Sequence, residues 1–334
     1  MFVTQKISLK DQTSTGEARR AAQHLAETLG MDEVATEEAA IIVTEASRNA
    51  VVHGGGGELL LSGTSQSQRK WLDIVALDKG PGIADISSAM RDGFSTGSTP
   101  GTGLGAIRRL ASVCDIFSNS TGTAVFARVG SSGDQRQTQD IAGFAIPVDG
   151  EKVCGDAIAW VETRDRLMVI LADGLGHGPR AAEAADEAVQ TFQAHSSLPP
   201  GQILARVHDA LRKTRGAAVA IAEIRPLSGT ITYTGVGNIS GVVMSEGNLG
   251  RNLVSHNGTV GHIAPRIQEF TMQWPRDGRL VMYSDGLLTK WSLSPYPGLV
   301  NRPAALIAAI LLRDFRRGRD DSSVFVLQHT KAEP

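Results

Sequence analysis

The stretch Val43–Gly57, VTEASRNAVVHGGGG, is the feature around which the first half of the chain is organised. Glu45, Asn49 and His53 recur every four residues, so on a helix they lie on one face, about 6 Å apart along the axis. The residues between them are mostly apolar and supply a side that can be buried. A carboxylate and an amide held in register on such a helix suit a site that binds a metal-bound phosphate and accepts a proton. The alternative is a helix whose polar stripe simply faces solvent.

The composition indicates a globular chain with two domains. Its 334 residues exceed the usual size of one domain, and a hydrophobic content of 41% excludes global disorder. Because 33 basic residues nearly balance 35 acidic ones, we expect neither nucleic acid nor a membrane as a partner. Cys114 and Cys154 lie far apart without metal-ligand spacing, and the N-terminus is too polar for a signal peptide. No apolar run approaches about 18 residues, so we expect a soluble, cytoplasmic protein.

The rest of the first half alternates between helical and strand-like patterns. We expect Thr15 to cap a first helix that ends at Gly30, and a second helix to span residues 33–53. The strand before Asp78 is rich in apolar residues and leads directly into a turn. Strands are predicted at residues 2–9, 58–62, 71–77, 115–119 and 124–129.

The turn Asp78-Lys79-Gly80-Pro81-Gly82 has a chemistry of its own. Asp78, at the end of a strand, can accept a hydrogen bond from an exocyclic amine. Gly80 and Gly82 let the backbone approach a flat ring closely. Taken alone the motif is a weak signal, because Gly-Pro-Gly often does no more than reverse the chain.

A second glycine motif, Gly101-Thr102-Gly103-Leu104-Gly105, opens the helical run AIRRLASV. Glycines at a helix N-terminus expose backbone N–H groups and the positive end of the helix dipole to phosphates. A lone GxGxG is again a weak signal. Between the two motifs, residues 94–100 (FSTGSTP) have the small, polar composition of a mobile lid.

The order of these features resembles the GHKL (Bergerat) nucleotide-binding fold, an α/β sandwich that is found in histidine-kinase ATPase domains and anti-sigma-factor serine kinases. The resemblance covers about residues 1–130. Within it, the segment DKGPGIADISSAMRDGFSTGSTPGTGLGAIRRL is most similar to the RsbT-type switch kinases of bacterial stress signalling. A histidine kinase is not expected, because His24 lies inside the domain and no separate helical hairpin precedes it.

This resemblance implies a role for each motif. Asn49 would coordinate the Mg²⁺ that bridges the ATP phosphates. Glu45 would be the general base that takes the proton from an acceptor serine or threonine. Asp78 would read the adenine amine, with Gly80 and Gly82 beside the ring and Gly101, Gly103 and Gly105 lining the phosphates.

Residues 131–136 form a short polar break, which we take as the linker between a domain at 1–130 and a second domain at 137–330. Aspartates in the second domain stand at predicted strand ends or tight turns: Asp156, Asp173, Asp285 and the pair Asp320 and Asp321. Such oxygen ligands suit hard divalent cations, and two ions that share carboxylates can activate a water beside a phosphate. For any single aspartate the alternative is a turn-capping role. Strands are predicted at 153–160, 167–172, 217–224, 229–234, 280–284 and 323–328, with 217–224 and 229–234 paired, and helices at 181–194 and 201–214.

The ordered set GD…DGLGHG…GVGN…SDG…RDDSS resembles the SpoIIE/RsbX branch of metal-dependent serine/threonine phosphatases, whose fold is an α-β-β-α sandwich. The resemblance implies that Asp173 bridges two Mn²⁺ or Mg²⁺ ions and that Gly174 offers its carbonyl to one of them. His177 is expected to be a turn residue rather than a catalyst. Asp156, Asp285 and Asp320 would complete the ligands, with Asp321 as the alternative to Asp320, and a metal-activated water would attack the phosphoserine phosphorus.

The sequence therefore predicts a two-domain α/β (α+β) protein that acts in a bacterial partner-switching pathway ending in a sigma factor or another effector. The N-terminal domain would use ATP and Mg²⁺ to phosphorylate a serine or threonine of a STAS-type antagonist protein, and the C-terminal domain would remove such phosphates. A downstream switch protein or effector is a further candidate partner. The alternative is a phosphatase whose GHKL domain is a non-catalytic, ATP-gated docking module, although retention of both Glu45 and Asn49 favours chemistry. A catalytically inactive second domain is disfavoured by its full set of acidic positions.

Overall fold

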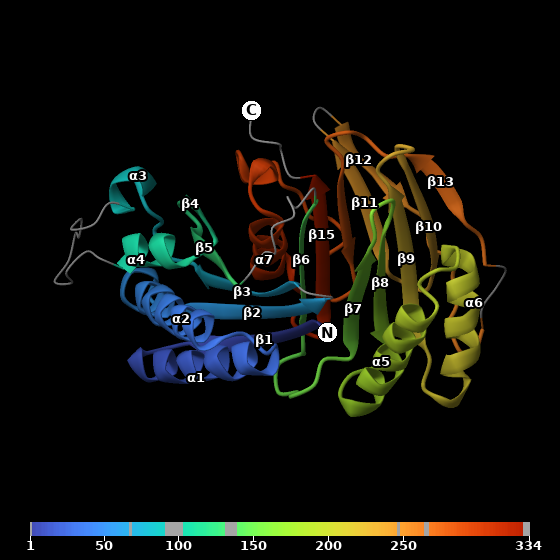
Figure 1. The fold of residues 1–334 in the computed structure, drawn as a ribbon, viewed down its shortest axis with the longest axis horizontal. Coiled ribbons are helices and arrows are strands. Elements are labelled where there is room, and N and C mark those ends of the chain that lie inside the picture. The colour runs from blue at the N-terminus through green and yellow to red at the C-terminus, as the bar shows by residue number, and fades with distance from the viewer. Residues whose placement is uncertain are drawn as a thin grey trace. The chain divides into compact units, whose positions relative to one another are not determined.

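The computed structural model describes residues 2–66, 69–90, 103–130, 139–245, 248–263 and 267–329 (Figure 1). By its contacts the chain divides into two compact units. Unit 1 comprises Met1–Arg136 together with Ser292–Arg313, and unit 2 comprises Gln137–Trp291 together with Asp314–Pro334. The segment Ser292–Arg313 thus belongs to unit 1, although it lies inside the range 137–330 that the sequence analysis gave to the second domain.

Unit 1 is built on an antiparallel sheet with the strand order β1-β2-β3-β5-β4. Helix α1 packs on α2, and α2 packs on β3 and β5, so both helices cover one face of the sheet (Figure 1). Consecutive residues of β3, such as Ile74 and Val75, point to opposite faces and are both buried, which explains the apolar run at residues 74–77. The elements are β1 (Phe2–Leu9), α1 (Gln12–Thr28), α2 (Glu33–Gly54), β2 (Gly57–Gln66), β3 (Arg69–Asp78), α3 (Ile86–Ala89), α4 (Gly103–Leu110), β4 (Val113–Asn119) and β5 (Gly122–Val129).

Helix α1 begins earlier than the sequence suggested. The Asp11 carboxylate accepts hydrogen bonds from the backbone N–H groups of Thr13 and Ser14 at 2.9 and 3.2 Å, and therefore caps the helix. The prediction that Thr15 is the cap is wrong, because Asp11 satisfies the N–H groups of the first turn one helical turn earlier. At the other end Gly30 has a φ of 68° just beyond the helix, which confirms its predicted role in ending it.

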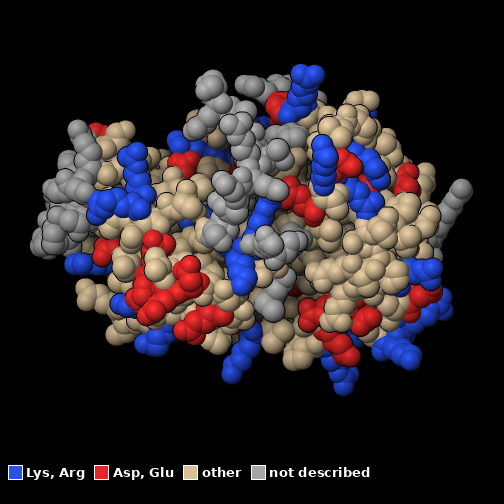
Figure 2. All heavy atoms as spheres, in the orientation of Figure 1, with Lys and Arg blue, Asp and Glu red and all other residues tan. Residues whose placement is uncertain are grey.

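Helix α2 is bounded by a local signal at each end. The Asp32 carboxylate accepts a hydrogen bond from the backbone N–H of Ala35 at 2.8 Å. Gly55 ends the helix with a left-handed φ of 73°. The prediction of a helix over 33–53 is confirmed to within one residue by the observed range Glu33–Gly54. Acidic side chains gather over α1 and α2 on the face drawn in Figure 2.

The segment Ser292–Arg313 contains the short helix η2 (Leu299–Asn301) and nearly all of α7 (Ala304–Phe315). Neither helix was predicted from the sequence. Every residue from Ala304 to Leu312 is buried, so the helix is apolar all round and shows no amphipathic period. None of the helices in the described part of the chain combines the length and apolar character needed to cross a bilayer.

Unit 2 contains two sheets of antiparallel strands, ordered β13-β10-β9-β8-β7 and β12-β11-β14-β15-β6. The rings of Trp160 on β7 and Phe325 on β15 lie 5.9 Å apart between centroids, so side chains of the two sheets pack together. Helix α5 packs on β7 and β8, and α6 packs on β9 and β10. The predicted pairing of 217–224 with 229–234 is confirmed. The elements are β6 (Gln139–Ile146), β7 (Asp156–Glu162), β8 (Leu167–Gly174), α5 (Pro179–Ala194), α6 (Pro200–Ala210), η1 (Leu211–Lys213), β9 (Ala217–Arg225), β10 (Thr230–Val236), β11 (Ser240–Ser245), β12 (Asn248–Leu253), β13 (Phe270–Gln273), β14 (Arg279–Tyr283) and β15 (Ser322–His329).

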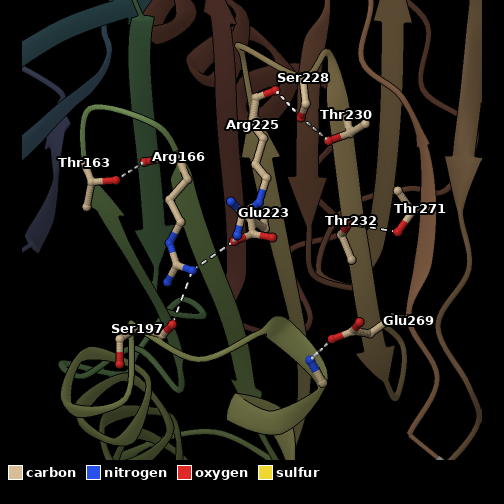
Figure 3. Close-up of polar contacts among 11 residues, drawn as sticks. Thr163, Arg166, Ser197, Glu223, Arg225, Ser228, Thr230, Thr232, Glu269 and Thr271 are labelled. Carbon is tan, nitrogen blue, oxygen red and sulfur yellow. Dashed lines mark hydrogen bonds and ion pairs between the residues drawn. The ribbon is translucent and has the colours of Figure 1, made fainter.

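A buried carboxylate ties the helical layer of unit 2 to its sheet. Glu223 on β9 is only 5% exposed and accepts hydrogen bonds from Arg166 at 3.0 Å and from Arg225 at 2.9 Å (Figure 3). Arg166 also donates to the carbonyl oxygen of Ser197, in the connection between α5 and α6, at 3.5 Å (Figure 3). Because the charge of Glu223 is matched by two guanidinium groups, it can stay buried.

Candidate functional site

The first candidate site lies where α2 meets the start of α4. Glu45 and Asn49 are partly exposed on α2, and α2 packs against α4. A Cβ atom built on Gly103, the first residue of α4, would lie 2.9 Å from Glu45 Oε2 and 3.5 Å from the Asn49 side-chain amide. A side chain at this position would therefore displace the Glu45 carboxylate and contact the Asn49 amide. The structure brings Glu45, Asn49 and Gly103 together, and places Gly105 in a buried position within α4, whereas Gly101 lies outside the described residues.

Asp78 lies beside the end of the same helix α2. Its Oδ1 accepts hydrogen bonds from the backbone N–H groups of Gly80 at 2.9 Å and Thr123 at 3.1 Å. Among the described residues Oδ2 receives no hydrogen bond, so this oxygen can accept one from a ligand amine. A Cβ atom built on Gly54 would lie 2.4 Å from the Asp78 Cβ, so the end of α2 touches the aspartate directly.

The two glycines of the Asp78 turn also have a structural reason to be glycine. A Cβ atom on Gly80 would lie 2.8 Å from the Cα of Gly54. Gly82 has a φ of 81°, and a Cβ atom there would lie 2.1 Å from the carbonyl oxygen of Asn119. The turn therefore needs both glycines in order to pack against α2 and β4, in addition to any contact with a ring. The expected lid at 94–100 lies outside the described residues.

The second candidate site lies in unit 2 at the ends of several strands. Asp156, the first residue of β7, stands opposite Asp173 of β8 in the antiparallel register. The hydroxyl of Ser284, directly after β14, donates a hydrogen bond to Asp156 Oδ2 at 2.7 Å. The same hydroxyl oxygen accepts a hydrogen bond from the backbone N–H of Ser323 on β15 at 3.0 Å. These bonds tie both of the later acidic turns to Asp156.

Negative charge accumulates around Asp173. Burial, together with four neighbouring carboxylates, raises the pKa of Asp173 to about 9. The pKa of Asp156 rises to about 7, chiefly because of burial, although the hydrogen bond from Ser284 lowers it. Oδ1 of Asp156 is buried and has no hydrogen-bond partner among the described residues. The four carboxylates that raise the pKa of Asp173 belong to Asp156, Asp285, Asp320 and Asp321.

The adjacent residues Asp320 and Asp321 have different surroundings. Asp321 is 2% exposed, and its two carboxylate oxygens accept hydrogen bonds from the backbone N–H groups of Val148 at 2.7 Å and Gly155 at 2.6 Å. Asp320 is partly exposed, and its Oδ1 accepts a hydrogen bond from the backbone N–H of Asp321 at 2.9 Å. Asp321 is therefore engaged in holding two backbone segments, which favours Asp320 as the residue with oxygen atoms to offer a metal.

Two further residues of this region contact acidic groups. Asn238, from the GVGN motif, donates a hydrogen bond through Nδ2 to Asp285 Oδ2 at 2.7 Å. The motif is visible in the sequence, but nothing near it in the chain indicates this role for Asn238. His177 Nδ1 lies 2.8 Å from Glu151 Oε1, and its side chain is 58% exposed, as expected of a turn residue.

The chemistry of these residues fits a pair of hard divalent cations. The donors are all oxygen atoms, one buried carboxylate oxygen lacks a partner among the described residues, and the carboxylates crowd around Asp173. Within the described ranges, no three His, Cys, Asp or Glu side chains already converge as a ready metal cage. Asp156 and Asp285 each accept a hydrogen bond from a neighbouring side chain, which orients the carboxylate.

Comparisons with known proteins agree with the two halves of the chain. Residues 163–330 match the family model of Stage II sporulation protein E (SpoIIE), and residues 9–129 match that of the histidine kinase-like ATPase domain. The serine/threonine-protein kinase RsbT of Bacillus subtilis (strain 168) is 36% identical over 93 residues, which cover 28% of this chain and 70% of RsbT. The phosphoserine phosphatase RsbX of the same organism is 24% identical over 144 residues, which cover 43% of this chain and 72% of RsbX.

A solved structure shows the same fold in unit 2. The crystal structure of RsbX in complex with magnesium matches with a TM-score of 0.51 and 19% identity, over 59% of this chain and 98% of that one. The predicted fold class is confirmed: the N-terminal domain is GHKL-like and the C-terminal domain has the PP2C-type phosphatase fold. Because the SpoIIE model alone spans half of the chain, this protein belongs to the Stage II sporulation protein E family, with a histidine kinase-like ATPase domain preceding the phosphatase domain.

Proposed function

We propose that the protein is a bifunctional regulator of a bacterial partner-switching pathway in the cytoplasm. The N-terminal domain phosphorylates a serine or threonine of a STAS-type antagonist protein with ATP, and the C-terminal domain removes phosphate from phosphoserine or phosphothreonine. The observation that carries this proposal is that each unit keeps its own set of functional groups, Glu45 and Asn49 in unit 1 and the aspartates around Asp173 in unit 2. Similarity to a serine/threonine-protein kinase and to a phosphoserine phosphatase supports the same assignment.

In the phosphatase site, two Mn²⁺ or Mg²⁺ ions would supply Lewis-acid charge and lower the pKa of a water molecule. The role of the protein is to hold and orient the side chains that bind the ions. Ser284 orients the Asp156 carboxylate and Asn238 orients that of Asp285 through the hydrogen bonds described above. The proposed ligands are Asp173 as the bridging residue, Asp156, Asp285, Asp320 and the carbonyl oxygen of Gly174.

In the kinase site, Glu45 accepts the proton of the acceptor hydroxyl and Asn49 holds the Mg²⁺ of the nucleotide. Asp78 accepts a hydrogen bond from the adenine amine through Oδ2, while Gly80 and Gly82 lie beside the ring. The backbone at the start of α4 provides N–H groups and the positive end of the helix dipole for the phosphates, and Gly101, Gly103 and Gly105 are the glycines proposed to line them.

Two opposed activities on one chain would consume ATP without effect if both acted on one substrate at the same time. We therefore expect the two domains to act on different partners or states, or one domain to inhibit the other. A downstream switch protein or effector is the further partner in such a circuit.

The proposal is tested with two variants of the full chain that serve as controls for each other. Transfer of radiolabel from ATP to a STAS-domain protein is measured for the wild type, Glu45→Gln and Asp173→Asn. Release of phosphate from the phosphorylated STAS protein with Mn²⁺ is measured for the same three proteins. Glu45→Gln should lose transfer and keep release, and Asp173→Asn should do the reverse. Absence of transfer by the wild type, with ATP binding intact, would overturn the kinase half in favour of a docking module.

A further inference from the structure

Residues Ser292–Arg313 connect unit 1 to the acidic turns of unit 2 through the chain itself. The segment begins seven residues after Asp285, and the chain returns to unit 2 at Asp314, six residues before Asp320. Both neighbouring turns carry proposed metal ligands. Within unit 1 the segment contacts β4 twice: Arg302 donates a hydrogen bond to Asp115 Oδ1 at 2.9 Å, and the rings of Tyr296 and Phe117 lie 6.2 Å apart.

The last residue of the segment reaches the nucleotide site. The guanidinium of Arg313 donates a hydrogen bond to the carbonyl oxygen of Asp78 at 3.1 Å. A Cβ atom built on Gly122, whose φ is 139°, would lie 2.1 Å from the same carbonyl oxygen and 2.9 Å from the Arg313 guanidinium. The glycine therefore leaves room for this contact. Arg313 thus holds the backbone of the residue whose carboxylate is proposed to read the adenine amine.

In unit 2 the chain on either side of the segment is joined beside Asp285. The backbone N–H of Leu288 donates to the carbonyl oxygen of Phe315 at 2.9 Å, and that of Arg317 donates to the carbonyl oxygen of Gly286 at 2.8 Å. A Cβ atom built on Gly286 would lie 2.0 Å from the carbonyl oxygen of Asp321, so this turn also packs on the second acidic turn. Arg313 is two residues along the chain from Phe315, which takes part in this pairing.

We propose that adenine nucleotide bound in unit 1 controls the phosphatase rate of unit 2 through Ser292–Arg313, with Arg313 as the positioning residue that couples Asp78 to the turn of Asp285. The inference rests on the proposed function, because it requires a nucleotide at Asp78. A nucleotide that engages the Asp78 carboxylate restrains its backbone and hence Arg313. The restraint passes along the chain to the backbone paired beside Asp285.

The test measures nucleotide affinity and phosphatase rate on the same full-length proteins. The probes are a non-hydrolysable ATP analogue, its guanine counterpart as a control for metal chelation, and p-nitrophenyl phosphate with excess MnCl₂. Arg313→Ala is compared with the conservative Arg313→Lys and with Arg302→Ala, which removes the contact to β4 from a side chain that is 42% exposed. The matched control is Arg19→Ala, because within the described part of the chain the Arg19 side chain forms only an exposed ion pair with Glu37.

In the wild type, the adenine analogue should change the phosphatase rate at least about fivefold and the guanine analogue should not. Arg313→Ala should weaken binding of the adenine analogue about tenfold and abolish the change in rate. Arg313→Lys should restore part of the nucleotide affinity and part of the change in phosphatase rate. Arg302→Ala should reduce the change in rate, and Arg19→Ala should behave as the wild type. If the wild type binds the analogue without a change in rate, or if Arg313→Ala responds as the wild type does, the inference is overturned and the proposed function stands. If the wild type binds no adenine nucleotide, the kinase half of the proposed function fails first.

Discussion

Asp320 and Asp321 show how two identical side chains, adjacent in sequence, take different tasks. The carboxylate of Asp321 is buried and uses both oxygens to hold the backbone at Val148 and Gly155. The Asp320 carboxylate is partly exposed and is engaged through one oxygen by its neighbour's N–H. A carboxylate whose two oxygens already accept hydrogen bonds from backbone N–H groups has a structural role. Its exposed neighbour is then the better ligand for a cation.

The asparagine variants of these two residues should therefore differ. Asp321→Asn should lower the free energy of unfolding by about 1–3 kcal/mol, because an amide offers only one acceptor oxygen to two buried N–H donors. Asp320→Asn should leave it within about 0.5 kcal/mol and weaken Mn²⁺ binding by at least about tenfold. Urea unfolding without metal and calorimetric titration with Mn²⁺ measure the two effects. Reversed outcomes would make Asp321 the ligand.

Cys114 provides a prediction about pH. Burial, and then the negative charge of Asp115, raise the pKa of the Cys114 thiol from 9.0 to about 11. A raised pKa means that the thiol keeps its proton through neutral and mildly alkaline pH, so little thiolate is present. At pH 8 its alkylation by iodoacetamide should be about a hundredfold slower than that of an unperturbed cysteine, and the rate should rise about tenfold per pH unit up to pH 9. Mass spectrometry of the Cys114 peptide gives the rate; a plateau near pH 9 would contradict the expectation.

At the scale of elements, an ion pair joins β3 to β5 inside unit 1. Arg128 donates to both oxygens of Asp73, at 2.6 and 2.9 Å, and both side chains are at most 6% exposed. The guanidinium also lies 5.2 Å from the ring centroid of Trp71 and 5.8 Å from that of Phe126. The pair thus combines two charged hydrogen bonds with packing on aromatic rings.

Replacing one partner of this ion pair should lower the free energy of unfolding far more than replacing both. Arg128→Ala should lower the free energy of unfolding by about 3–5 kcal/mol, because it leaves the Asp73 charge buried without the guanidinium that pairs with it. The double variant Asp73→Leu, Arg128→Met should recover most of that loss, because apolar side chains of similar size tolerate the same environment. Equal destabilisation by the single and double variants in denaturant unfolding would show that packing of Arg128, rather than its charge, dominates.

The elements that could be predicted from sequence are those with local signals. α2 could be predicted to within one residue because its polar side chains recur every four residues in an otherwise apolar stretch. In the structure Asp32 and Gly55 cap its two ends. The start of α1 was misplaced because Asp11, Thr13 and Thr15 are all acceptable caps, and only the hydrogen bonds of the folded chain choose between them. α7 was missed because its residues are apolar all round, so neither of the periods that reveal helices and strands is visible.

At the scale of the whole molecule, long-range contacts explain which parts of the sites stayed hidden. The aspartates at strand ends could be proposed as ligands from the sequence alone. Their partners could not, because Asn238 is 47 residues from Asp285, and Ser284 is 128 residues from Asp156. The return of Ser292–Arg313 to unit 1 is also invisible in sequence, since it depends on contacts with strands about 180 to 235 residues away along the chain.

The chain passes from unit 2 into unit 1 at Ser292 and returns to unit 2 after Arg313. We therefore predict that the two units unfold together in one cooperative transition. Both ends of Ser292–Arg313 continue into unit 2, so unfolding of unit 2 would free both ends of this segment. The buried α7 residues that belong to unit 1 would then lose their packing, and we expect neither unit to keep its core when the other unfolds. Mn²⁺ at a hundred times its Kd stabilises its site by about 2.7 kcal/mol. Scanning calorimetry should then show one transition that moves upward by several degrees with Mn²⁺, with equal calorimetric and van't Hoff enthalpies. In Asp173→Asn, which should not bind the ion, the transition should stay in place. Two transitions, of which Mn²⁺ moves only one, would mean that the inserted segment is a passive connection.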